Sequence, residues 1–266
     1  MPRFAANLSW LYTEHPFLER FAAARRDGFQ AVECLFPYDH PPERIAALLR
    51  EQGLRQVMFN APPGDWAGGE RGLAGLPGRE AEFRDAMRLA LDWAQALDCP
   101  RVHVMAGTVS GDPALHWRTY LANLAWAAER AGAAGVGLLI EAINPRDMPG
   151  YLLTRQAQAH EAVQQVGSPH LRVQMDLYHC QVAEGDVAGL LQRFLPTGRV
   201  AHLQVAGVPD RHEPDLGELD VDALWGLIDR LGYAGWIGCE YRPAGPDTSA
   251  GLGWWHRARA EGLAGE

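Results

Sequence analysis

Short apolar runs alternate with longer amphipathic segments along the whole chain. The apolar runs have the length and composition of buried strands. We predict strands at residues 3–8, 31–35, 55–60, 101–105, 137–141, 171–176, 200–204 and 236–240. Segments 80–97 and 114–131 place apolar residues at helical spacing, so they are predicted to be amphipathic helices between the strands.

Eight strand–helix units in a chain of 266 residues are the number that a (β/α)8 barrel requires. A doubly wound open sheet would show the same alternation. Polar side chains decide between them, because they fall at or near the ends of six predicted strands: Asn7, Asn60, Glu141, Asp176, Gln204 and Glu240. A barrel brings all these ends to one rim, whereas an open sheet separates them. We therefore predict the α/β class and a single TIM barrel over residues 1–266.

The longest irregular segment, residues 62–80 (PPGDWAGGERGLAGLPGRE), follows the third predicted strand and has six glycines. Long loops in compact domains are commonly lids or binding loops. The alternative is a flexible connection. We predict a loop over the active site, which would lie at the carboxyl ends of the strands.

Composition narrows the classes of function. The net charge of −9 argues against nucleic acid as the main partner, since phosphate binding needs basic surfaces. The four cysteines form no CxxC pair, and no apolar stretch is long enough for a membrane span, so we expect a cytoplasmic protein with reduced thiols. The chain has no lysine, which excludes a Schiff base and covalent pyridoxal phosphate. It also has no glycine-rich phosphate loop, so no nucleotide cofactor is predicted.

Four consecutive predicted strands end in side chains that carry oxygen. They are Glu141, Asp176, Gln204 and Glu240. In a closed barrel these side chains converge, and three carboxylates held close together repel one another unless a cation lies among them. Oxygen ligands suit a hard divalent ion, so we predict that these four residues bind Mg²⁺ or Mn²⁺.

Two glutamates beside a metal ion indicate a reaction type. A metal ion that bridges a carbonyl and a neighbouring hydroxyl acidifies the C–H bond between them and stabilises an enediolate. One glutamate can remove that proton and the other can return a proton to the adjacent carbon. The predicted reaction is the isomerisation or epimerisation of a small hydroxy-carbonyl compound.

Other polar residues near the rim are candidates for binding the substrate. Arg71 and Arg211 can pair with an anionic group, although either arginine could equally brace a loop or the surface. His179 and Asn7 are predicted to contact the substrate as well. His103 and His202 are predicted to be structural.

Several runs of this sequence resemble the hydroxypyruvate isomerase family of the xylose isomerase-like TIM barrels. The runs, which follow the family's order over almost the whole chain, are FAANLSWL (4–11), LFPYD (35–39), PPGDWAGGERGLAGLPGREAEFRDA (62–86), IEAIN (140–144), MDLYH (175–179), RHEP and GE (211–218) and GWIGCEY (235–241). The resemblance implies an isomerase that interconverts hydroxypyruvate and tartronate semialdehyde. It also implies that Glu141 and Glu240 are the acid/base pair, within the four-residue metal site given above.

The chain departs from the family's usual motifs at three places. Ala142 stands where the family usually has proline, Gly207 stands in place of an acid, and Asp215-Leu216 replaces Gly-Thr. None removes a predicted ligand, but they leave the substrate open between hydroxypyruvate and a 2-oxo-tetronate, one carbon longer. A ketose 3-epimerase, an abasic-site endonuclease and a non-catalytic barrel are the further alternatives. The sequence leaves open whether the protein is a homo-oligomer.

Overall fold

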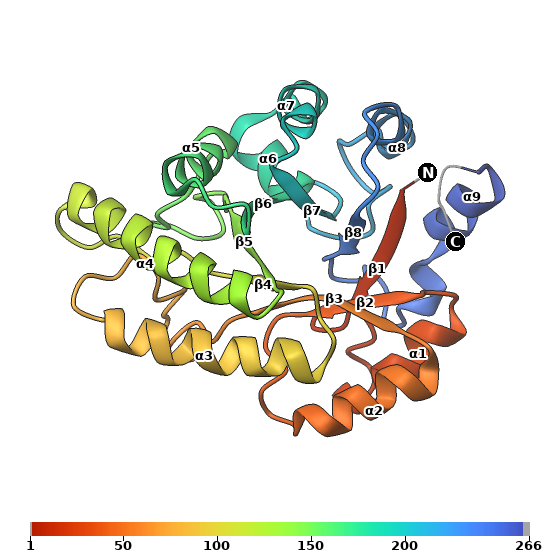
Figure 1. The fold of residues 1–266 in the computed structure, drawn as a ribbon. Coiled ribbons are helices and arrows are strands. Elements are labelled where there is room, and N and C mark those ends of the chain that lie inside the picture. The colour runs from red at the N-terminus through yellow and green to blue at the C-terminus, as the bar shows by residue number, and fades with distance from the viewer. Residues whose placement is uncertain (1, 263–266) are drawn as a thin grey trace.

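The computed structural model describes residues 2–262, and its centre is a closed barrel of eight parallel strands (Figure 1). Each strand pairs with the next one in the sequence, and β1 pairs with β8 to close the barrel. The strands are β1 (Arg3–Asn7), β2 (Ala31–Cys34), β3 (Arg55–Asn60), β4 (Arg101–His103), β5 (Gly137–Glu141), β6 (Leu171–Asp176), β7 (Val200–Val205) and β8 (Trp236–Cys239). The predicted (β/α)8 barrel is confirmed, and the strand ends agree with the predicted ones to within two residues.

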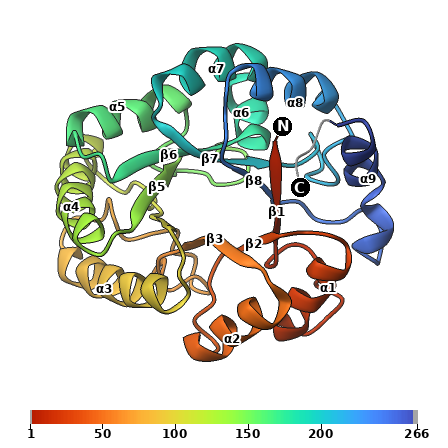
Figure 2. The ribbon, with the colours of Figure 1, turned by 45° about the vertical axis from the view of Figure 1, so that its right-hand side comes forward.

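Helices surround the barrel as an outer layer, which Figure 2 shows as a ring in chain order. They are α1 (Arg20–Arg26), α2 (Pro42–Gln52), α3 (Glu80–Ala96), α4 (Pro113–Ala133), α5 (Gln156–Val166), α6 (Leu177–Glu184), α7 (Val187–Phe194), α8 (Val221–Arg230) and α9 (Gly253–Ala260). Short 3-10 turns occupy Phe17–Glu19, Leu195–Thr197 and Ser249–Gly251. Within residues 2–262, no helix combines the length and the apolar character that crossing a membrane requires.

Local sequence signals set several helix boundaries. Asp112 caps α4 by accepting a hydrogen bond from the backbone N–H of Ala114, and Pro113 occupies the first helical position. Gly53 ends α2 with a φ of 63°, a left-handed conformation that glycine adopts without the steric penalty of a Cβ. The Asp112 boundary thus ends the loop that follows β4, and the Gly53 boundary begins the short turn that leads into β3.

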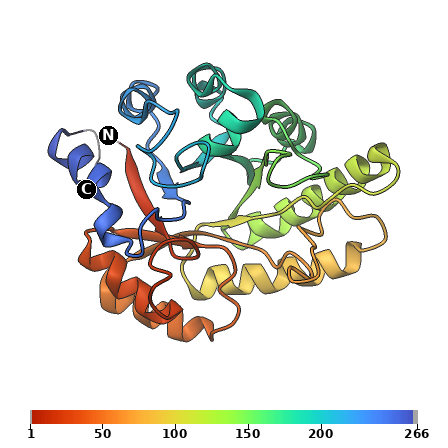
Figure 3. The ribbon, with the colours of Figure 1, turned by 180° about the vertical axis from the view of Figure 1, so that it is seen from behind.

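The C-terminal helix α9 packs against β1, the strand that pairs with β8 to close the barrel. Phe4 of β1 packs edge-to-face on Trp225 of α8 and on Trp254 and Trp255 of α9, with ring centroids 5.0, 5.2 and 5.4 Å apart. Figure 3 shows β1 beside the C-terminal helix from behind. The two C-terminal tryptophans therefore pack into the helix layer of their own chain.

The second half of the 62–80 loop is packed against the segment that follows β4. Leu73 and Ala74 are buried, and Gly75 donates its N–H to the carbonyl of Ala106 at 2.7 Å. A Cβ on Gly72 would lie 2.3 Å from the carbonyl oxygen of Met105, so only glycine allows this close approach. This half of the loop is an ordered part of the barrel's rim rather than a loose connection.

Candidate active site

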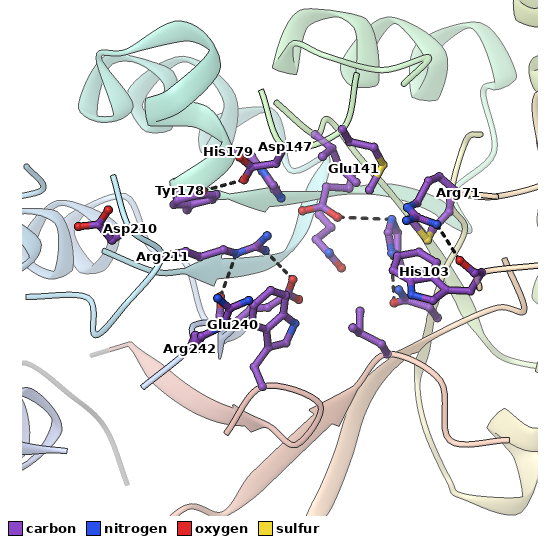
Figure 4. Close-up of a pocket in the computed structure, with 18 residues that line it drawn as sticks. Arg71, His103, Glu141, Asp147, Tyr178, His179, Asp210, Arg211, Glu240 and Arg242 are labelled. Carbon is purple, nitrogen blue, oxygen red and sulfur yellow. Dashed lines mark hydrogen bonds and ion pairs between the residues drawn. The ribbon is translucent and has the colours of Figure 1, made fainter. Parts of the chain in front are cut away.

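A pocket of about 420 Å³ opens at the carboxyl ends of the strands. Its wall includes residues from the ends of β3, β4, β5 and β6 and from the segments after β7 and β8 (Figure 4). Glu141, His179, Arg211 and Glu240, all predicted from the sequence, line it together with Arg71. The barrel's strand order explains this convergence, because strands far apart in the sequence end at one rim.

Arg211 lies between two acids of the site: Glu240, which lines the pocket, and Asp176, which is fully buried and does not line it. Its Nη2 atom donates to Oε1 of Glu240 at 2.6 Å and lies 3.4 Å from Oδ2 of Asp176. The guanidinium also lies 4.6 Å from the ring centroid of Trp10 and 4.8 Å from that of Tyr178. A charged, planar group between two aromatic rings is held in one orientation. In this structure Arg211 is thus a partner of the predicted catalytic groups.

Asp176 and His179 belong to one strand-to-helix turn. Asp176 ends β6 and caps α6 by accepting a hydrogen bond from the backbone N–H of Tyr178 at 2.8 Å. His179 follows in the first turn of α6, and its Nε2 lies 3.6 Å from Oδ2 of Asp176. Its Nδ1 lies 2.6 Å from Nδ2 of Asn144, which fixes the ring. The i, i+3 spacing therefore aims both side chains at the same space.

Glu141 has a histidine neighbour that the sequence analysis took to be structural. Nε2 of His103 lies 3.7 Å from Oε2 of Glu141, and Nδ1 lies 3.2 Å from Oδ1 of Asn60. Burial and the nearby His202 lower the pKa of His103 to about 3, so its ring is neutral near pH 7. His103 lines the pocket beside Glu141, although its side chain is buried, and its structural role stays a prediction.

Two side-chain amides lie beneath Glu240. Nε2 of Gln204 donates to Oε2 of Glu240 at 2.6 Å, and Nδ2 of Asn7 donates to the same oxygen at 3.1 Å. Both amides also donate to Glu33, a fully buried acid on β2. Nε2 of His202 lies 2.6 Å from Oε2 of Glu33, and His202 is completely buried, which agrees with the structural role predicted for it. Neither Asn7 nor Gln204 is exposed to the solvent.

Burial perturbs the ionisation of the pocket's acids. Burial, together with the charges of Asp176 and Glu240, raises the pKa of Glu141 well above its ordinary value. Burial raises the pKa of Asp176 to about 6 and that of Glu240 to about 8, although Arg211 opposes both shifts. Burial lowers the pKa of Arg211, but the charges of Glu240 and Asp176 outweigh this effect and the net shift is upward. Such perturbed acids are typical of catalytic sites.

The donor set of the pocket fits a divalent cation. Glu141, Asp176 and His179 each offer one ligand atom, and these atoms lie within 4.8 Å of one another. In the described part of the chain, no other trio of His, Cys, Asp or Glu residues forms such a group. Three buried carboxyl groups face one guanidinium, so additional positive charge would be stabilised there. His179, predicted to contact the substrate, thus also stands among the possible ligands.

The other two predicted ligands are held differently in this structure. Oε1 of Glu240 accepts from Arg211 and its Oε2 accepts from Gln204. Oε1 of Gln204 accepts from Nε2 of Gln174 at 2.7 Å. These oxygens have lone pairs beyond the hydrogen bonds, but Glu240 is not part of the trio of close ligand atoms, and the ligand roles of Gln204 and Glu240 stay predictions.

Arg71 and Trp66 bring the 62–80 loop to the pocket. The guanidinium of Arg71 lies 4.1 Å from the ring centroid of Trp66, and both residues line the cavity. Nη1 of Arg71 donates to the backbone carbonyls of Trp66 and Glu70 at 3.1 and 2.7 Å. The loop holds this arginine at the rim through its own backbone, and its contact with a substrate stays a prediction.

Some polar residues of the site were not predicted from the sequence. Gln174 lines the pocket with a buried Oε1 that has no hydrogen-bond partner, and it lies two residues before Asp176 on the same face of β6. Glu33 is an acid at the end of the predicted strand 31–35, the same signal that singled out Asp176. Asp147 and Tyr178, which share a hydrogen bond of 2.7 Å, come from loop and helix positions that no strand-end criterion detects.

The fold and pocket define a (β/α)8 protein with buried, perturbed carboxyl groups at the carboxyl ends of its strands. The chain belongs to the xylose isomerase-like TIM barrel family, whose model matches residues 21–258. This confirms the resemblance stated from the sequence motifs.

Named relatives cover nearly the full length of the chain. It is 57% identical to a 2-oxo-tetronate isomerase of Cupriavidus necator over 96% of this chain and 97% of that protein. It is 41% identical to the hydroxypyruvate isomerase of Escherichia coli over 96% and 98% of the two chains. The crystal structure of AP endonuclease, family 2, from Brucella melitensis is 47% identical and superposes with a TM-score of 0.94, covering 97% of this chain and 99% of that one.

Proposed function

We propose that this protein is an isomerase of short hydroxy-carbonyl acids that moves a proton between adjacent carbon atoms with Glu141 and Glu240. The observation that carries the proposal is the pair of buried carboxyl groups that enter one pocket from β5 and from the end of β8 (Figure 4). The names of the relatives support the reaction class. A 2-oxo-tetronate is placed first among the substrates because the relative with 57% identity carries that name, and hydroxypyruvate is placed second.

The two glutamates divide the proton transfer between them. One glutamate, as carboxylate, takes the proton from the carbon that bears the hydroxyl group. The other, as carboxylic acid, gives a proton to the former carbonyl carbon, while the hydroxyl proton passes to the former carbonyl oxygen. The raised pKa values of both groups support this division, since a carboxyl group must be available in its acid form near neutral pH.

The remaining polar residues bind and orient the substrate in this proposal. Arg211 and Arg71 offer guanidinium groups for the substrate's carboxylate, and His179 lines the pocket beside the reacting carbons. Asn7, predicted to contact the substrate, is fully buried outside the pocket's lining and would act through its hydrogen bond to Glu240. Glu141, Asp176, Gln204 and Glu240 remain the proposed ligands of Mg²⁺ or Mn²⁺, with His179 as a further candidate. Such a cation, when bound, would polarise the carbonyl and hydroxyl oxygens and so acidify the C–H bond between them.

A panel of substrates tests the function. The purified protein, with Mn²⁺ or Mg²⁺, is incubated with hydroxypyruvate, a 2-oxo-tetronate, a ketohexose and a DNA duplex that contains an abasic site. We expect isomerisation of both acids, with the higher kcat/KM for the 2-oxo-tetronate. Failure to isomerise either acid would refute the proposal, and ketohexose epimerisation in their place would favour the epimerase alternative.

The abasic-site duplex in this panel tests for the endonuclease activity after which the Brucella melitensis structure is named. A nuclease on this barrel would be expected to have a basic surface for phosphate groups, and the net charge here is −9. We expect no cleavage of the abasic-site duplex. Cleavage that increases with enzyme concentration, and that is lost in Asp176→Asn, would instead support the nuclease alternative.

Divalent metal is expected to stabilise the protein more at pH 8 than at pH 6. The folded-state pKa values of Asp176 and Glu240 lie above their ordinary values, so in metal-free protein these carboxyls destabilise the fold increasingly as the pH rises toward 8. A cation binds the deprotonated groups and offsets this loss. At a concentration 100 times its Kd, the cation contributes about 2.7 kcal/mol, or roughly 5–10 °C in Tm.

Differential scanning fluorimetry with Mn²⁺ or EDTA at the two pH values measures this effect. Asp176→Asn is the matched variant, since it removes one proposed ligand oxygen and should reduce the Mn²⁺ shift at both pH values. An equal Tm with Mn²⁺ and with EDTA at pH 8 would remove the metal ion from the proposal.

A further inference from the structure

Glu33 is a buried acid that lies beneath the pocket without lining it. It sits near the end of β2, directly beside Asn7 of β1 in the strand register, and its exposed fraction is 0%. Its Oε1 accepts from Nδ2 of Asn7 at 2.9 Å and from Nε2 of Gln204 at 2.7 Å, and its Oε2 lies 2.6 Å from Nε2 of His202. A carboxylate this deeply buried is stable only because several donors converge on it.

Two of these donors connect Glu33 to Glu240. Nε2 of Gln204 lies 2.7 Å from Glu33 and 2.6 Å from Glu240, and Nδ2 of Asn7 lies 2.9 and 3.1 Å from the same two acids. Each amide nitrogen has two hydrogens, so it can serve both carboxylates at once. The carboxylate of Glu33 therefore favours the amide orientation in which both nitrogens face Glu240.

The carboxylate of Glu33 fits against β8 because Gly238 has no side chain. Gly238 of β8 is the register neighbour of Gln204, and a Cβ built on it would lie 2.2 Å from Oε1 and 2.3 Å from Oε2 of Glu33. Those oxygens are buried and hydrogen-bonded, so they cannot move away freely. Glycine at this position of β8 thus preserves the place of the Glu33 carboxylate.

We propose that Glu33 is a positioning residue that holds the amides of Gln204 and Asn7 toward Glu240 and so fixes the carboxylate of Glu240 for proton transfer. Its effect on turnover rests on the proposed function above. Its effect on the two amides does not, because that follows from the hydrogen bonds alone. The same amide orientation turns Oε1 of Gln204 away from Glu240, toward Gln174.

Glu33→Gln tests this role. The glutamine keeps the size of the side chain but has one acceptor oxygen for three donors, so Gln204 and Asn7 lose their common orientation. We expect kcat to fall about 10- to 100-fold, as for other residues that orient reacting groups, with a smaller change in KM. Gly238→Ala should lower kcat in the same direction, because it displaces the carboxylate without removing its charge. Gln56→Leu, a buried polar residue outside the pocket, should leave kcat unchanged.

A double-mutant cycle separates positioning from a structural role. If Glu33 acts in part through Gln204, then Glu33→Gln should lower kcat by a smaller factor in a Gln204→Ala background than in the wild type, and the remaining effect is the part that acts through Asn7. If the two losses multiply, the two residues act independently and the proposal fails. Wild-type kcat in well-folded Glu33→Gln would overturn it as well.

Nuclear magnetic resonance of the wild-type side-chain amides gives a readout that needs neither catalysis nor a folded Glu33 variant. The Gln204 side-chain NH2 signals, assigned by their loss in Gln204→Ala, are expected to exchange slowly with solvent. Rapid exchange would overturn the proposal, even if Glu33→Gln does not fold. Absence of turnover in the wild-type substrate panel, combined with slow amide exchange, would reject the proposed function and retain the positioning of the amides.

Discussion

Glu240→Gln is expected to lower kcat by about 10³-fold while the protein keeps its fold. A positioned acid/base group typically contributes about 10²- to 10⁴-fold to the rate. Glutamine has nearly the same shape as glutamate but cannot accept or release the proton. Its NH2 group would face one of the donors that now contact Glu240, namely Arg211, Gln204 and Asn7, so the free energy of unfolding should fall by about 1–3 kcal/mol. Steady-state kinetics and thermal unfolding measure the two effects.

Glu213→Gln is the matched control for burial. Glu213 is also a buried glutamate, and it accepts a hydrogen bond from the backbone N–H of Ala244 at 3.1 Å, but it does not line the pocket. Its replacement should reduce stability and leave kcat close to that of the wild type. Wild-type turnover in Glu240→Gln would exclude Glu240 as an acid or base.

Glu141→Gln is expected to reduce kcat to a similar extent, by about 10³-fold, but to leave a different partial reaction. In the proposed mechanism the two glutamates serve different carbon atoms of the substrate, so a variant with one of them intact should still remove and return a proton at one carbon. In D2O, each variant should incorporate deuterium into one isomer of the substrate without net isomerisation. Glu141→Gln and Glu240→Gln should favour opposite isomers.

Mass spectrometry of each isomer, incubated separately with each variant in D2O, measures this exchange. The control is His103→Asn, which alters a neighbour of Glu141 but leaves both carboxyl groups in place. Exchange of the same isomer by both glutamate variants would show that one residue does all of the proton transfer. In that case the division of labour proposed for the pair is wrong.

The alternation of apolar runs and amphipathic segments was sufficient to predict the barrel. Each strand of a parallel barrel is a short apolar run that pairs with its neighbour in the sequence. The predicted strands 55–60, 137–141 and 171–176 agree with β3, β5 and β6 at both ends. The predicted strand 101–105 was too long, since β4 ends at His103. Val104 and Met105 continue the apolar pattern and are buried, and Val104 still donates its N–H to the carbonyl of Leu139 on β5 at 2.8 Å, although both residues lie beyond the end of β4.

One rule predicted the acids of the site but not the residues that surround them. The rule that strand ends meet at one rim brought Glu141, Asp176 and Glu240 together. It could not reveal that Arg211 pairs with two of them, because that depends on the path of the loop after β7 and on a positive φ of 59° at Arg211. Nor could it distinguish His103 from a core histidine, since both lie on buried strands and differ only in the neighbour that each side chain meets.

Glu33 shows a different limit of sequence reasoning. The acid in the run AVEC stood at a strand end like the others, but its partners come from β1 and β7, which are 26 and 171 residues away. A hydrogen-bonded cluster of this kind is a property of the closed barrel and not of any one segment. No local pattern distinguishes an acid that serves such a cluster from one that caps a helix.

The pairing of β1 with β8 has a consequence for the time at which the protein becomes active during synthesis. Asn7 and Glu240 are among the first and last residues of the barrel, and they meet across this seam. A nascent chain therefore carries all eight strands and α1 to α8 before Glu240 is added, and only then can the proposed proton-transfer pair be complete. Translation products that end before β8 would lack both the β1–β8 pairing and Glu240.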